Sequence, residues 1–162
     1  MSAVRDPAPG WQAPLIGRPW RLHARGPDAF DCWGLVEWAW AEFAGLDLSP
    51  FRRGAVARDS RTRALEMAAR AEAAAGSDRF MGLARPRPLA IGVVTFKRIP
   101  VHVGLYARGG RFVHACEDSG AVRQDEVADF ATRSGSKVTA WYWPADAATG
   151  TGGAAWGPGG AP

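Results

Sequence analysis

Apolar residues recur with a helical period in the first part of the chain. A helix that begins at residue 32 and stops at Gly45 would carry five mostly apolar side chains on one face: Cys32, Val36, Ala39, Trp40 and Phe43. A second, alanine-rich helix is predicted over residues 60–75, between a polar cap and Gly76. Its apolar stripe is narrow, so we expect this helix at the surface, whereas the first helix has a face for the core.

The pattern changes from helical to alternating after a proline-containing linker at residues 79–88. Alternation predicts strands over residues 90–96, 101–106, 111–116 and 138–143, and residues 121–122 can extend one of them. A short helix capped by Asp125 is expected over residues 125–131. Helices followed by strands predict an α+β domain with an antiparallel sheet.

The length of 162 residues and an apolar content of 47% suit one globular domain. We expect an N-terminal extension over residues 1–14, a folded domain over residues 15–144 and a Gly/Ala-rich tail over residues 145–162. The tail has too few apolar side chains to build a core. It should be flexible, or ordered only against a partner.

The net charge of +4 and the pI near 9.7 make the chain moderately basic. The basic residues are scattered, without a dense run interleaved with aromatic residues, so nucleic-acid binding is not favoured. No stretch is long and apolar enough for a membrane span, and no secretory signal is visible at the N-terminus. The two cysteines fall in different expected elements, and we expect both as free thiols.

Cys32 would stand at the start of the first helix. The unpaired N–H groups and partial positive charge of a helix N-terminus favour a thiolate, which predicts a lowered pKa for Cys32. The same N–H groups can bind the oxyanion that forms in acyl transfer. For an isolated cysteine, the alternative is a small buried core residue.

Two histidines lie on consecutive expected strands. Alternation sets His102 on the face opposite Val103, and His114 shares the face of His102 only if the connecting loop has three or five residues. Cys32 would then attack a carbonyl carbon, His102 would take the thiol proton and return it to the leaving amine, and His114 would hold the tautomer of His102. Ordinary strand histidines or a zinc site are the alternatives. No close pair of ligands supports zinc, so no metal or cofactor is expected.

Three sequence segments together resemble a known family: Phe30-Asp31-Cys32-Trp33-Gly34-Leu35-Val36, His102-Val103-Gly104-Leu105-Tyr106 and Gly110-Arg111-Phe112-Val113-His114-Ala115. They are similar to the NlpC-type cysteine peptidases, a branch of the papain-like fold whose members mostly cleave peptide bonds in peptidoglycan stems. The resemblance covers roughly residues 16–143 and implies a catalytic triad of Cys32, His102 and His114. The candidates for substrate or oxyanion binding are Trp20, Asp31, Trp33 and His23. Trp20 stands where the family commonly has tyrosine, and Val93 where it often has aspartate.

The Asp-Cys-Trp-Gly-Leu-Val form, without a signal peptide or wall-anchoring repeat, resembles the phage-tail and gene-transfer-agent branch of that family. This resemblance implies a tail-associated endopeptidase, made in the host cytoplasm and carried in a virion tail or gene-transfer particle, that opens the cell wall as DNA enters. Its expected partners are peptidoglycan stem peptides and tail proteins, without nucleic acid or membrane insertion. Two alternatives are a structural tail-tip or hub component with a weak or inactive site, and an intracellular thiol amidase or acyltransferase.

Overall fold

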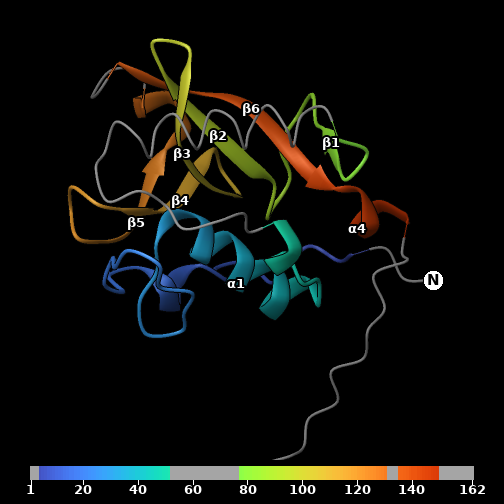
Figure 1. The fold of residues 1–162 in the computed structure, drawn as a ribbon, viewed down its shortest axis with the longest axis horizontal. Coiled ribbons are helices and arrows are strands. Elements are labelled where there is room, and N and C mark those ends of the chain that lie inside the picture. Colours follow the sequence, from blue (N-terminus) through green and yellow to red (C-terminus); the bar gives the residue numbers. More distant parts are fainter. Residues whose placement is uncertain (1–3, 52–76, 131–134, 150–162) are drawn as a thin grey trace, which may run out of the picture.

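A computed structural model describes residues 4–51, 77–130 and 135–149. In this part of the chain, an N-terminal helical region lies along one side of an antiparallel sheet (Figure 1). The helix predicted over residues 60–75 lies outside the described residues. The architecture is α+β, as the order of helical and alternating patterns predicts.

Helix α1 (Cys32–Ala44) begins and ends where the sequence predicts. Asp31 is its N-cap, and its carboxylate accepts the backbone N–H of Gly34 at 2.7 Å. Gly45 ends the helix in a left-handed conformation (φ 65°), and its N–H donates to the carbonyl of Ala41. Two short 3₁₀ helices flank α1 in the chain, η1 (Ala13–Leu15) and η2 (Ser49–Phe51).

The described residues form one sheet with the strand order β1-β6-β2-β3-β4-β5. All of its paired strands are antiparallel. The strands are β1 (Phe80–Gly82), β2 (Ile91–Phe96), β3 (Ile99–Ala107), β4 (Arg111–Cys116), β5 (Ala121–Glu126) and β6 (Ser136–Pro144). Strands β2, β3, β4 and β6 confirm the four predicted strands, with ends that differ by at most two residues.

Two segments differ from the prediction. Strand β1 lies inside the predicted linker, because Phe80 is buried and pairs with Pro144 at the end of β6. The short helix predicted over residues 125–131 starts too early, because Asp125 is not its cap but belongs to β5 and pairs with Phe112 of β4. Only a 3₁₀ turn, η3 (Val127–Asp129), follows this strand before residue 130. In both segments, pairing with a neighbouring strand overrides the local pattern.

Helix α1 buries its apolar side against the sheet and the segment that precedes β2. Trp40 is fully buried, packs edge-to-face on Trp143 with ring centroids 4.7 Å apart, and donates its indole N–H to the carbonyl of Leu89. Other members of this core are Leu35, Val36, Ala39, Val103, Leu105, Val113 and Ala115. The core side chains of β3 are therefore Val103, Leu105 and Ala107, and His102 alternates to the other face.

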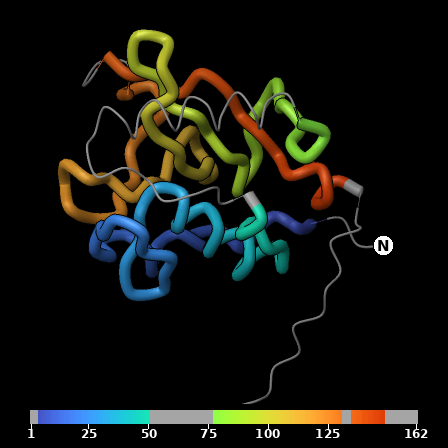
Figure 2. The backbone as a smooth tube through the Cα atoms, viewed as in Figure 1, coloured from blue at the N-terminus to red at the C-terminus, as the bar shows by residue number. Residues whose placement is uncertain are grey.

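Both ends of the described chain contact this core, and they lie on the same side of the molecule (Figure 2). Trp11, within the predicted extension, is buried and packs edge-to-face on Phe43. The tail expected from residue 145 begins with the short helix α4 (Ala145–Thr149), which buries Ala147 in this core. Among the described segments, none of the helices has the length and apolar character that a bilayer crossing requires.

Candidate active site

Cys32 occupies the first position of α1, where the helix start meets β3. It is a half-buried free thiol, and backbone hydrogen bonds reach it from Val103 and from Trp33. Val103 follows His102 directly in β3. The structure therefore brings the start of α1 against the part of β3 that carries the first of the two histidines.

The pKa of the Cys32 thiol is raised to about 11. Burial is the main cause, because it penalises the charged thiolate, and the negative charge of Asp31 adds to it. The two backbone hydrogen bonds and Arg25 act in the opposite direction but are outweighed. The predicted lowering of the Cys32 pKa is therefore wrong for the resting site, where the sulfur is a neutral thiol at pH 7.

His102 and His114 lie side by side on one face of the sheet, and the loop between their strands has three residues, one of the two lengths, three or five, that this placement requires. Ala107 pairs with Arg111, so residues 108–110 form that loop. Nε2 of His102 lies 2.8 Å from Nδ1 of His114, and the two ring planes are nearly perpendicular, at 78°. Gly104 makes this approach possible, since a Cβ there would lie 2.7 Å from the carbonyl oxygen of Val113 and 2.9 Å from the Cβ of His114.

A carboxylate that the sequence reasoning missed continues the line of contacts. Nε2 of His114 lies 2.9 Å from Oδ2 of Asp125 on β5, and Arg123 donates to Oδ1 of the same carboxylate at 3.2 Å. Asp125 pairs with Phe112 and is therefore diagonal to His114 on the same face of the sheet. The signal that could have found it is the tight turn after Cys116, which folds residues 121–126 back on β4 as a hairpin.

Aromatic side chains enclose the two imidazoles. Phe112 stacks on His114 with ring centroids 5.4 Å apart and also meets His102 edge-on, and Phe130 contacts both Phe112 and His114. Burial lowers the pKa of His102 to about 3, and neighbouring His114 contributes. Burial also lowers the pKa of His114, although Asp125 partly opposes this effect. Both imidazoles are therefore neutral at pH 7.

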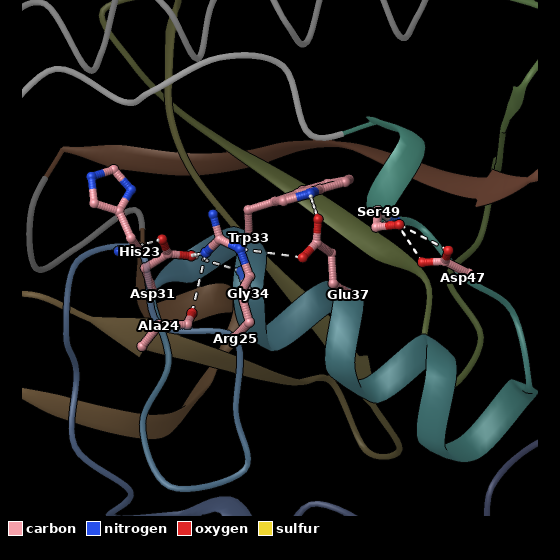
Figure 3. Close-up of polar contacts among 9 residues, drawn as sticks. All are labelled: His23, Ala24, Arg25, Asp31, Trp33, Gly34, Glu37, Asp47 and Ser49. Carbon is pink, nitrogen blue, oxygen red and sulfur yellow. Dashed lines mark hydrogen bonds and ion pairs between the residues drawn. The ribbon is translucent and has the colours of Figure 1, made fainter.

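The loop before Cys32 is bound to the first two turns of α1 by a compact polar cluster (Figure 3). Arg25 forms ion pairs with Asp31 and with Glu37, two carboxylates that are each only 6% exposed. The indole of Trp33 donates to Glu37 at 2.9 Å. Removing Arg25 would leave two buried charges without this cation, so the cluster holds the helix start in a defined position.

The four predicted substrate-binding or oxyanion residues have different surroundings. Asp31 accepts the backbone N–H groups of His23 and Gly34 in addition to the ion pair, so both of its oxygens are engaged within the chain. Trp33 is half-buried beside Cys32. His23 is exposed, and its imidazole points away from the polar cluster (Figure 3). Trp20 is half-buried, and its backbone bridges to Phe30.

The neutral thiol gives a testable pH dependence. Below its pKa, each unit of pH raises the thiolate fraction of Cys32 about tenfold. Alkylation of Cys32 by iodoacetamide is therefore expected to accelerate continuously from pH 6 to pH 10, since the pKa is about 11. Mass spectrometry of a Cys116→Ala variant, which leaves only Cys32 to react, measures this rate. A plateau reached below pH 8 would contradict the raised pKa and indicate a preformed thiolate.

One family profile and several solved structures match this chain. The profile described as the NlpC/P60 family matches residues 17–139. The solved structures of NlpC2 and NlpC1 from Trichomonas vaginalis share the fold, each with a TM-score of 0.50, at 19% and 20% sequence identity. The alignments cover 80% and 78% of this chain but 42% and 39% of those chains, so this chain spans about two fifths of their length.

The NlpC/p60 domain of the peptidoglycan hydrolase SagA aligns with a TM-score of 0.46 and 17% identity, over 72% of this chain and 83% of that one. Among curated proteins, none matches the sequence. The family profile covers Cys32, His102 and His114, so the three predicted catalytic residues lie within the matched region.

Proposed function

The chain belongs to the NlpC/P60 family, and we propose that it is a cysteine peptidase that hydrolyses peptide bonds of peptidoglycan stem peptides through Cys32, His102 and His114. One observation carries the proposal. The thiol at the start of α1 contacts the backbone of β3 beside His102, whose ring is hydrogen-bonded to His114. A nucleophile at a helix start, a base on the adjoining strand and a third group on that base form the arrangement that acyl transfer requires.

The first half of the reaction forms an acyl-enzyme. Nε2 of His102 is engaged with His114, so Nδ1 is the nitrogen that receives the proton of the Cys32 thiol. As the proton leaves, the sulfur attacks the carbonyl carbon of the scissile bond, and the oxygen becomes an oxyanion. Asp31 caps the N–H of Gly34 and Trp33 contacts the sulfur, so the N–H of Cys32 at the helix start is the group that can bind this oxyanion.

The second half returns the site to its resting state. The proton on His102 passes to the leaving amine, the carbon–nitrogen bond breaks, and a thioester remains on Cys32. A water molecule then gives a proton to His102 and attacks the thioester carbon. The released acid takes the oxygen, and the proton returns to the sulfur. The neutral resting thiol and imidazole fit this route, in which the thiolate forms only as substrate is attacked.

Digestion of purified peptidoglycan tests the proposal. The folded protein is incubated with sacculi of several stem chemistries, and the soluble products are identified by mass spectrometry. New stem-peptide fragments are expected from at least one wall type, with masses that identify the cleaved bond, and none from a Cys32→Ala digest. If folded wild-type protein releases nothing from any of these walls, the peptidoglycan proposal fails, and a soluble amide substrate or a structural role takes its place.

A finer proposal concerns where the peptidase acts. We propose that it travels in a phage tail or gene-transfer particle and opens the host wall locally. The support is the Asp31-Cys32-Trp33-Gly34 form of the nucleophile segment, which resembles that branch of the family. Proteomic analysis of purified particles from the producing cells should find the chain at a fixed ratio to the tail proteins. Its absence from particles, with the protein present in the cell extract, would contradict this placement.

A further inference from the structure

We propose that Asp125 is a positioning residue that fixes the tautomers of both site histidines, so that Nδ1 of His102 carries the lone pair that accepts the thiol proton. Asp125 would act through His114 and would not touch the substrate. The kinetic consequence of this role rests on the proposed peptidase function. Its structural content, the location of two ring protons, does not.

Because the third residue of the proposed triad, His114, is a histidine, its presence alone does not decide which of the two rings donates the hydrogen bond between them. Nδ1 of His114 can accept a hydrogen bond or donate one, depending on its tautomer. If His114 carried its proton on Nδ1, it would donate to Nε2 of His102, and neutral His102 would carry its own proton on Nδ1. That tautomer of His102 has no lone pair at Nδ1 for the thiol proton. Another group must therefore select the productive tautomer.

The contact with Asp125 makes this selection. An ionised carboxylate can only accept hydrogen bonds, so the 2.9 Å contact places a proton on Nε2 of His114. Neutral His114 has one ring proton, which leaves Nδ1 without one. The 2.8 Å contact between the rings is then donated by Nε2–H of His102. As a result, Nδ1 of His102 is free of a proton and can act as the base.

The surroundings of Asp125 support a fixed orientation. The carboxylate is 12% exposed and the side chain of His114 is 5% exposed, so both groups are shielded from bulk water. Arg123 binds the other carboxylate oxygen, so contacts within the chain hold both oxygens of Asp125. Phe112 and Phe130 pack against the His114 ring and limit its rotation. The negative charge of Asp125, on the other side of His114, also stabilises the imidazolium cation that forms on His102 during proton transfer.

Long-range ¹H–¹⁵N spectra of the histidine rings test the structural content without any substrate. At pH 7 we expect the wild-type protein to hold His102 and His114 in the Nε2–H tautomer, with exposed His23 as an internal reference. In Asp125→Asn, Arg123 will keep the amide oxygen, and the NH₂ group will face Nε2 of His114. Both rings should then move to the Nδ1–H tautomer. A wild-type His102 protonated on Nδ1, or unchanged tautomers in Asp125→Asn, would overturn the proposal.

Steady-state kinetics, measured from the release of stem-peptide fragments, test the effect of Asp125 on catalysis. Asp125→Asn is expected to lower kcat about 100-fold with KM unchanged within about twofold, because it acts on proton transfer and not on binding. Asp118→Asn, the same change at an exposed position in the β4–β5 turn, should leave both constants unchanged. In a His114→Asn background, where an amide oxygen can accept the His102 proton directly, Asp125→Asn should change kcat by less than about threefold.

The two measurements separate the possible failures. Inactive wild-type protein with the expected tautomers would reject the peptidase function and keep the role of Asp125 in setting the ring protons. An active wild-type protein whose kcat is unchanged in Asp125→Asn would reject the positioning role alone. The wild-type spectrum can overturn the inference even if Asp125→Asn does not fold.

Discussion

Alanine at position 32 is expected to lower the rate of stem-peptide release by at least about 10⁴-fold, because it removes the atom that forms the acyl-enzyme. The loss should be in kcat, since the oxyanion donor at the helix start and the surrounding side chains remain. The fold should survive, because alanine is a good helix former at the first position of α1 and removes only a half-buried thiol. Mass-spectrometric progress curves on purified peptidoglycan measure the rate, and circular dichroism checks the fold.

Cys116→Ala is the matched control for this change. Cys116 is the other free and half-buried thiol, and it lies at the end of β4, two residues beyond His114. Its removal should leave the rate within about twofold, because no step of the proposed reaction uses its sulfur. If the Cys32→Ala protein kept a substantial rate, or the Cys116→Ala protein lost its activity, the assignment of Cys32 as the nucleophile would be wrong.

A single methyl group at Gly34 is expected to lower the free energy of unfolding by about 3 kcal/mol or more. A Cβ at this position would lie 2.0 Å from the carbonyl oxygen of Ala24, which is backbone and accepts the N–H of Asp31. The clash can be relieved only by moving the loop away from the first turn of α1. Urea unfolding of Gly34→Ala should show the loss, and peptidase activity should fall with it because Cys32 is displaced.

Gly82→Ala provides the control, since a Cβ at Gly82 meets nothing within 4 Å and the backbone there is not left-handed. That substitution should change the free energy of unfolding by less than about 1 kcal/mol. If Gly34→Ala were as stable as Gly82→Ala, the loop and the helix start would not be packed as closely as the structure shows.

The sequence predicts the main elements of this fold because each has a strong period of its own. Helix α1 has apolar residues at helical spacing and Gly45 at its end, and the sequence alternates in the four predicted strands, β2, β3, β4 and β6. The side-by-side placement of His102 and His114 also follows from a local quantity, the length of the loop between β3 and β4. These features depend on residues close together in the chain.

The missed features depend on residues far apart in the chain. Strand β5 buries Val122 and carries polar residues at most other positions, so its local pattern favours a helix cap at Asp125, and pairing with β4 makes the segment a strand. The raised pKa of Cys32 depends on how deeply α1 and β3 bury the sulfur together. Neither the burial of Cys32 nor the pairing of β5 with β4 can be predicted from a local sequence pattern.

The neutral resting thiol has a consequence for the durability of the protein. Peroxides attack thiolates far faster than thiols, so the route from cysteine to sulfenic acid and then to irreversible sulfinic acid starts from the charged form. With a Cys32 pKa of about 11, little of that form exists at neutral pH. Oxidation of Cys32 in the substrate-free protein should therefore be slow at neutral pH. Its rate with hydrogen peroxide should rise with pH in the same way as its rate of alkylation by iodoacetamide.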